Sequence, residues 1–427
     1  MKENAMRTTA PTIWPVDEVT IMKPSETVLC NDIPLWYIKG GSQEIVKFEL
    51  VFRAGSYNQE KPLQAFSATK LLKNGTSQKT AAQINQLWDY YGVSLQIEAQ
   101  KDLVSVGFFC LTRHLDPALD LLFEMIADAV YPQHELELLL KNRRQKHIIS
   151  MKKVQHIARV HFNELLFGSQ HPYGRILTID DFSSLTREDI MRFNQRFFRP
   201  ENCFCFVAGR FPDNIFELVN SKIRKYSWFK GDAIYEHREI NSNGVREKEK
   251  IVIEDAVQSS IRIGKLIAGR RHPDYHRISI ANTLLGGYFG SRLMKNIRQE
   301  KGYTYGIQSA IVSMLKASWF FITTQVGKQV CDAALEEIYK ELKGLKDKPA
   351  ADDELQLLKN YLSAGFLRSF DGPFMQIERF REILLFDQDY SYYDSFLPLL
   401  QKMKAADIQE VAEQHFNADE MTELIAG

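Results

Sequence analysis

The sequence predicts an α+β protein made of two homologous domains, each a mostly antiparallel β-sheet covered by helices. Three observations support this prediction: an internal repeat, strand-like segments that are grouped with helical ones, and one strongly polar segment between the two halves. Strict alternation of strands and helices would instead predict a parallel sheet. A chain of 427 residues is also long enough to form two domains of ordinary size.

The internal repeat consists of sequence matches at a constant offset. Residues 189–209 align without a gap on residues 407–427, 218 positions later, and both segments begin with Asp-Ile and end with Ala-Gly. The segment "LLKN" at 139–142 recurs at the same offset at 357–360. Matches that keep both their order and their offset indicate duplication of a domain.

The first half contains two strand-like segments and three helical ones. Residues 46–53 and 103–111 alternate in polarity or are rich in β-branched and aromatic side chains, which is typical of strands. Apolar residues recur at helical spacing over 80–91, 116–129 and 134–151. The last helix begins just after a Tyr-Pro pair, which often marks a helix boundary.

The second half repeats this pattern after a polar segment. The stretch "YEHREINSNGVREKEK" is expected to be a linker at 235–250, which separates an N-terminal domain at 1–234 from a C-terminal domain at 251–427. Strands are predicted near 251–254, 259–267 and 306–325, and helices near 274–285, 331–343 and 352–369.

The charge balance excludes some classes of partner. The chain has 54 Lys and Arg residues against 54 Asp and Glu residues, so no net field attracts nucleic acid or an anionic membrane surface. The basic run at 141–144 is expected to be a solvated helix face. No stretch of 18 apolar residues occurs, and the N-terminus lacks the apolar region of a signal peptide. We therefore expect neither a nucleic-acid nor a membrane partner, and a cytoplasmic location, or a periplasmic one if a leader was removed.

Three segments carry a family resemblance. Residues 71–96 ("LLKNGTSQKTAAQINQLWDYYGVSLQ"), 171–209 and 272–306 ("HPDYHRISIANTLLGGYFGSRLMKNIRQEKGYTYG") together resemble the pitrilysin/insulinase metallopeptidases, the inverzincins. The similarity covers nearly the whole chain. It implies half of a peptidase clamshell, built from paired α+β domains, and a zinc endopeptidase activity on unfolded peptides.

The zinc chemistry of that family is missing from the matching positions. The family binds zinc on a helix with the motif His-x-x-Glu-His, which falls here on residues 66–70. Phe66 has no lone pair and Lys70 carries its own positive charge, so zinc has no ligand there. Thr69, at the position of the catalytic glutamate, is too weak a base to activate water. The distal acidic ligand would fall near Gln145 or Lys146. We therefore predict no catalytic residue and no metal or other cofactor in this chain.

A second set of family residues is kept. In "SRLMKNIRQEKGYTYG", Arg298 is expected to close a helix, Gly302 to permit the turn and Tyr305 to begin the next strand. The resemblance implies that Arg298 and Tyr305 grip the substrate backbone, as an arginine and a tyrosine at this spacing do in the family. A guanidinium and a phenol can both donate hydrogen bonds to a peptide carbonyl. The alternative is that Arg298 complements the helix C-terminus and Tyr305 packs at a strand edge.

These positions lead to one functional hypothesis and two alternatives. The chain is predicted to be the non-catalytic subunit of a heterodimeric zinc peptidase, gripping the peptide while a homologous zinc-bearing partner supplies the metal. The alternatives are a structural scaffold of peptidase fold and a homodimeric peptide-binding chamber without hydrolysis. For peptide binding, the resemblance favours a sheet edge at 92–96, although Leu95 and Gln96 depart from the family's pattern.

Overall fold

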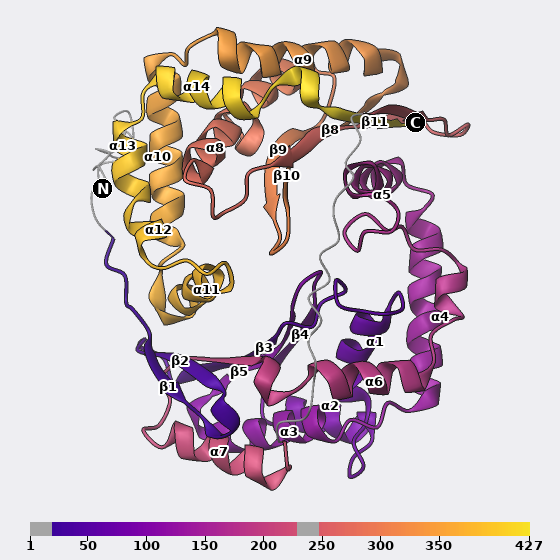
Figure 1. The fold of residues 1–427 in the computed structure, drawn as a ribbon, viewed down its shortest axis with the longest axis vertical. Helices are drawn as coiled ribbons and strands as arrows, with labels where there is room; N and C mark the ends of the chain where they lie inside the picture. Colours follow the sequence, from indigo (N-terminus) through magenta and orange to yellow (C-terminus); the bar gives the residue numbers. More distant parts are fainter. Residues whose placement is uncertain (1–18, 229–246) are drawn as a thin grey trace, which may run out of the picture.

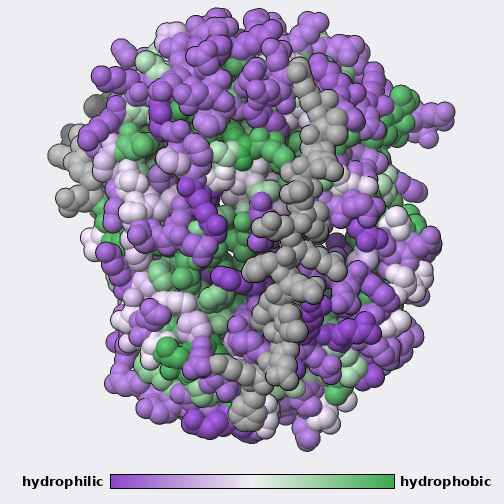
Figure 2. All heavy atoms as spheres, viewed as in Figure 1, coloured by the Kyte–Doolittle hydropathy of each residue, from purple (hydrophilic) through white to green (hydrophobic). Residues whose placement is uncertain are grey.

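The computed structural model describes residues 19–228 and 247–427. They form two halves, each with its own sheet and helices, which face each other across the middle of the molecule (Figure 1). Hydrophilic residues cover much of the face seen in Figure 2, and hydrophobic ones gather where the two halves meet. No helix within these two ranges is both long enough and apolar enough to cross a membrane.

The first half contains a six-stranded sheet. Its strands are β1 (Ser25–Val28), β2 (Pro34–Lys39), β3 (Ile45–Phe52), β4 (Ser94–Ala99), β5 (Val104–Leu111) and β6 (Cys203–Gly209). They lie in the order β1–β2–β6–β3–β5–β4, so β4 is an edge strand. The helices are α1 (Gln64–Lys70), α2 (Ala81–Tyr90), α3 (Leu115–Ala127), α4 (Gln133–Ser150), α5 (Val154–Phe167), α6 (Arg187–Phe197) and α7 (Ile215–Lys225).

The second half contains a five-stranded sheet. Its strands are β7 (Lys248–Ile251), β8 (Gln258–Ile267), β9 (Ile307–Ser313), β10 (Ser318–Gly327) and β11 (Thr422–Ala426), in the order β7–β11–β8–β10–β9. The helices are α8 (Tyr275–Asn282), α9 (Cys331–Asp347), α10 (Asp352–Arg368), α11 (Gly372–Leu385), α12 (Ser391–Asp394), α13 (Phe396–Lys402) and α14 (Ala405–His415). Two π-helical segments, Thr283–Gly287 and Met294–Glu300, follow α8.

The two halves repeat one topology, which confirms the predicted fold of two homologous domains. Strands β2, β6, β3, β5 and β4 correspond in order to β7, β11, β8, β10 and β9. The β2–β6 and β7–β11 pairs are both parallel, whereas the other pairs are antiparallel. The helices α5 and α6 recur as α11 and α14 at the 218-residue offset found in the sequence.

Three predicted segments differ in detail. The strand expected at 306–325 is the hairpin β9–β10, because a turn closed by the Met314 N–H donating to the Ala317 carbonyl divides it. Residues 248–250, expected in the linker, belong to β7, whose charged side chains suit a sheet edge. Residues 235–246 of that linker lie outside the described residues. The helix expected at 274–285 changes to a π-helical turn after α8, where a Cβ on Gly286 would lie 2.6 Å from the Ser309 nitrogen.

Each sheet is covered on one face by a helix from the opposite half. From the first half, α5 packs on β8 and β11, and its Phe162 lies in one apolar cluster with Trp319 and Phe321. At the equivalent position of the second half, α11 packs on β2 and β6, where Ile377 joins a cluster with Trp36. The two halves therefore exchange equivalent helices, and neither sheet is fully covered without the other half.

A buried ionic cluster accompanies the contact between α11 and the first sheet. Lys47 and Glu49, both on β3, are 3% and 7% exposed. The Lys47 Nζ lies 2.7 Å from a Glu378 oxygen and 3.5 Å from a Glu49 oxygen. Arg381, one turn after Glu378 on α11, also pairs with Glu49. Charges of both signs thus join the halves at this contact.

Candidate functional site

The degenerate zinc-motif positions lie on α1, which packs against β4 and α6. Thr69 is fully buried, and its hydroxyl donates to the Ala65 carbonyl at 2.6 Å. The Lys70 Nζ donates to the Ile97 carbonyl of β4 at 2.5 Å. Thr69 and Lys70 are therefore engaged in contacts within the first half.

The α4 side chain that faces this helix is a cation. The Arg143 guanidinium carbon lies 4.9 Å from the ring centroid of the half-buried Phe66. Gln145 and Lys146, where the distal ligand would fall, are exposed on α4. A ring, an ammonium and a guanidinium do not fit a zinc ion, which needs lone pairs. In the part of the chain that the structure describes, no cluster of three or more His, Cys, Asp or Glu side chains could hold a metal.

Arg298 and Tyr305 lie together near the edge strand of the second sheet. Arg298 belongs to the π-helical segment Met294–Glu300, so it lies two residues before the helix end rather than closing the helix. Gly302 takes the left-handed conformation, with φ of 66°, and turns the chain as expected. Tyr305 lies two residues before β9 instead of beginning the strand. The next residue, Gly306, is also outside the sheet ladder: its N–H donates to the Thr304 hydroxyl, and its carbonyl accepts a hydrogen bond from the Thr324 hydroxyl.

The two side chains of this pair differ in exposure, since Arg298 is half-buried. Tyr305 is 92% exposed. The Arg298 guanidinium carbon lies 5.0 Å from the ring centroid of Phe289, which is itself 63% exposed. No described carboxylate forms an ion pair with Arg298. Tyr305 is thus accessible, which does not fit the alternative that it merely packs at a strand edge.

Polar contacts to the helices α9 and α10 hold the second π-helical segment and the residues just before it. Arg292 donates through Nε and Nη2 to the two carboxylate oxygens of Glu354 on α10, both at 3.0 Å. Asn296 donates to Glu337 and Glu341 on α9 at 2.8 and 2.7 Å. These contacts hold the backbone that carries Arg298, because bidentate pairs constrain orientation as well as distance.

Both sets of predicted residues lie near an edge strand of their sheet. The motif helix α1 packs against the edge strand β4, and Tyr305 lies two residues before the edge strand β9. No hydrogen bond, ion pair or ring contact among the described residues links Phe66, Thr69 or Lys70 to Arg298 or Tyr305. The outer edge of β4 includes the predicted peptide platform from Ser94, and Lys70 already donates to it at Ile97.

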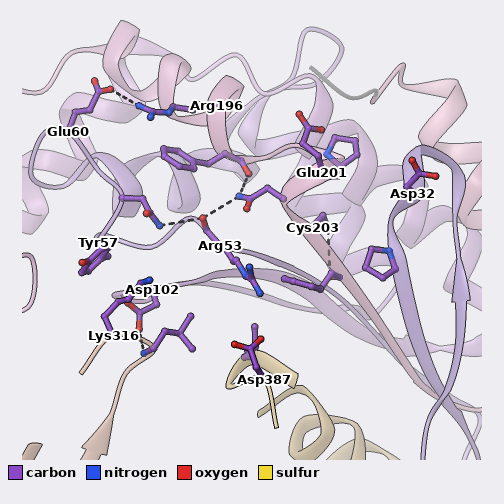
Figure 3. A pocket seen from close by; sticks show the side chains of 18 of the residues that line it. Asp32, Arg53, Tyr57, Glu60, Asp102, Arg196, Glu201, Cys203, Lys316 and Asp387 are labelled. Carbon is purple, nitrogen blue, oxygen red and sulfur yellow. Dashed lines mark hydrogen bonds and ion pairs between the residues drawn. The ribbon is translucent and has the colours of Figure 1, made fainter. Parts of the chain in front are cut away.

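A separate pocket of about 620 Å³ lies between the halves (Figure 3). The close view shows the ends of β3 and β6 on one side and the β9–β10 turn with the end of α11 on the other. Its wall is held by Asn202, which donates to the Phe197 and Arg53 carbonyls at 2.9 and 3.2 Å. Sequence reasoning missed this pocket, because its lining comes from distant segments that share no motif.

Asp102 connects the two hairpin turns at the edge of this pocket. It is 8% exposed, accepts the Leu315 backbone N–H at 2.8 Å and accepts a hydrogen bond from the Tyr173 hydroxyl. Burial raises the pKa of the Asp102 carboxyl, against the lowering effect of these donors and of Lys316 and Lys101. The native state therefore binds this proton more tightly than the unfolded chain does.

This linkage predicts a pH effect on stability. At pH values between the ordinary Asp pKa and the raised pKa of Asp102, the native state binds more protons than the unfolded state. The stability that Asp102 contributes is therefore lost as the pH rises through this range. Asp102→Asn should reduce this loss of stability with rising pH, because an amide does not titrate. Its oxygen can still accept the Leu315 backbone N–H. The measurement is urea unfolding from pH 4 to pH 7 for both proteins. Parallel stability curves over that range would contradict the prediction.

Comparisons with known proteins agree with the geometry. Residues 184–362 match the family described as the Peptidase M16 inactive domain. The "Uncharacterized zinc protease YmxG" of Bacillus subtilis is 21% identical over 82% of this chain and 85% of that protein. The "Non-peptidase homolog YmxG" of Helicobacter pylori is 19% identical over 91% of this chain and 90% of that protein. A solved peptidase M16 inactive domain from Pseudomonas fluorescens superimposes with a TM-score of 0.85, at 20% identity, over 95% of this chain and 98% of that chain.

These findings confirm the resemblance seen in the sequence. The matched family spans the segment that holds Arg298 and Tyr305, and the relatives and the solved structure extend over most of the chain. The side chains at the zinc-motif positions are those of a homologue without the metal ligands. The chain is thus similar over most of its length to M16 peptidase homologues, and its residues 184–362 match the M16 inactive-domain family.

Proposed function

We propose that the chain is a peptide-gripping, non-catalytic subunit that works with a homologous zinc-bearing partner. The observation that carries this proposal is the pair near β9: Tyr305 is 92% exposed, and the half-buried Arg298 lies over Phe289. A cation held in place on an aromatic face, with no ion pair to a described carboxylate, is available to a ligand.

The position of this pair suits an extended peptide. Strand β9 is paired to β10 on one side, and its other edge is the edge of the sheet. A peptide added at that edge would form main-chain hydrogen bonds, as strand addition generally does. Arg298 and Tyr305, just before the strand, could then donate to carbonyls of the same peptide and stabilise charge that develops on one of them.

The missing half of the chemistry would come from the partner. Since α1 offers no ligand, zinc and the base that activates water must lie on a homologous chain, with which this one would form a heterodimer. A homodimeric chamber without hydrolysis and a structural scaffold are the competing outcomes. The first would bind peptides but not cut them, and the second would assemble stably but show no effect of Arg298.

Arg298→Ala is expected to cost about 2 to 4 kcal/mol of transition-state stabilisation, the range found for loss of one oxyanion donor. The measurement is kcat/KM for peptide hydrolysis by the chain co-expressed with a zinc-bearing homologue. Arg298→Lys should recover only part of the activity, because an ammonium lacks the planar fork of donors.

Lys295→Ala is the matched control for this experiment. Lys295 lies in the same π-helical segment and forms no ion pair with a described residue. Its removal should leave hydrolysis unchanged. Equal turnover for Arg298→Ala and Lys295→Ala would exclude the gripping role, and absence of any complex with the homologue would exclude the heterodimer.

A further inference from the structure

Four cationic side chains extend from the motif helix α1 toward the second half, and we name them the cationic stripe: Lys101, Arg143, Arg159 and Arg262. They come from the β4–β5 turn, α4, α5 and β8 respectively. The whole chain carries 54 basic and 54 acidic side chains. The stripe is therefore a local excess of positive charge in a neutral protein.

Two members of the stripe lie on aromatic faces. The Arg143 guanidinium carbon is 4.9 Å from the centroid of Phe66, at the first position of the degenerate motif. The Arg262 guanidinium carbon is 4.1 Å from the centroid of Phe321 and 5.5 Å from that of Phe162. Aromatic faces hold cations in place by their quadrupoles without neutralising them.

The other two members contact neutral partners. The Arg159 Nη2 lies 3.2 Å from the His156 Nδ1, and the Lys101 Nζ donates to the Pro172 carbonyl at 2.9 Å. Burial lowers the pKa of His156, as do the neighbouring positive charges. Across residues 19–228 and 247–427, no carboxylate forms an ion pair with any member of the stripe.

The four charges act on one another. Partial desolvation by the surrounding protein, and then the positive charge of Arg143, lowers the pKa of Arg159, although much of its side chain remains exposed. Burial, and then Arg159, lowers the pKa of Arg262 to about 10, and the same two causes lower the pKa of Lys101, opposed by Asp102. Groups that lower one another's pKa repel, so an anion bound among them would relieve that repulsion.

We infer that the cationic stripe binds the carboxylates of an acidic peptide, beside the helix where the family's zinc motif would lie. This inference rests on the proposed function, because it names the class of peptide that the chain would grip. Arg143 and Arg159 are exposed and can offer their planar forks to carboxylates. The edge strand β4, which leads into Lys101, offers main-chain groups to an extended peptide, which favours a peptide over other anions.

The test measures fluorescence anisotropy of labelled peptides with the full chain. One peptide contains Asp and Glu, and a matched peptide contains Asn and Gln at the same positions, both with amidated C-termini. The acidic peptide should bind more tightly, and the difference should shrink as salt is added. A third peptide, free of acidic side chains but with a free C-terminus, shows whether a terminal carboxylate suffices.

The double variant Arg143→Gln/Arg159→Gln should weaken binding of the acidic peptide about tenfold or more, which is about 1.4 kcal/mol or more, because both substitutions remove charged hydrogen bonds to its carboxylates. Binding of the neutral peptide should not change. Arg144→Gln is the matched control, because Arg144 is an exposed α4 arginine next to Arg143 without an aromatic support among the described residues. Unchanged thermal unfolding of each variant verifies the fold.

The outcomes separate this inference from the function on which it rests. Equal binding of the acidic and neutral peptides would overturn the inference and leave peptide gripping intact. Absence of binding by every peptide would overturn both. Equal loss of affinity in the double variant and in Arg144→Gln would show a diffuse field rather than a site. Competition by a short oligonucleotide at lower concentrations than the acidic peptide would also overturn the inference.

Discussion

Phe162→Ala is expected to lower the free energy of unfolding by about 3 to 5 kcal/mol, the cost of truncating a fully buried phenylalanine. Phe162 is 0% exposed, in the cluster formed by α5 of the first half and the sheet of the second half. Its ring also lies under Arg262, 5.5 Å away. Removal of the ring would therefore leave a cavity between the halves and take one aromatic support from a buried cation.

The measurement is chemical unfolding followed by circular dichroism and tryptophan fluorescence, since Trp319 lies in the same cluster. Phe289→Ala is the matched control, because this phenylalanine is 63% exposed. Surface substitutions of that kind usually change stability by about 0.5 kcal/mol or less. A loss for Phe162→Ala no larger than that for Phe289→Ala would show that α5 does not hold the second sheet.

Glu49→Leu is expected to destabilise the protein by about 3 kcal/mol, the lower end of the cost of breaking a buried ion pair. The Glu49 side chain is 9% exposed and is paired with Arg381 and Lys47. Loss of the Glu49 carboxylate leaves the cations of Lys47 and Arg381 with one carboxylate in the cluster, that of Glu378. Arg381 is 24% exposed and can be partly hydrated, which keeps the expected cost at the lower end.

The double variant Lys47→Met/Glu49→Leu provides the discriminating measurement. It removes one charge of each sign and leaves Glu378 and Arg381 to balance each other, so it should be less destabilised than Glu49→Leu alone. Replacement of a buried ion pair by apolar side chains is often neutral or stabilising, whereas removal of one partner is costly. A double variant that loses the sum of the two single effects would show that Lys47 and Glu49 are not coupled.

The sequence by itself determined the repeat and the missing chemistry. The 218-residue offset places α5 on α11 and α6 on α14, because a duplicated segment keeps its local periodicity. Side-chain chemistry is also local information: Phe66, Thr69 and Lys70 cannot ligate zinc whatever surrounds them. The spacing of Arg298 and Tyr305 could also be recognised in the sequence. The neighbouring helix ends, and the neighbouring strand begins, two residues later than predicted.

Only the tertiary structure decided what each of these parts touches. Nothing in the pattern of α5 indicates that it covers the sheet of the other half, since an apolar face specifies burial but not the partner that buries it. The same holds for Arg143, one of a run of basic residues expected to be solvated, which alone among them lies on the ring of Phe66. Contacts between distant segments depend on how the whole chain closes, and periodicity within one segment cannot encode them.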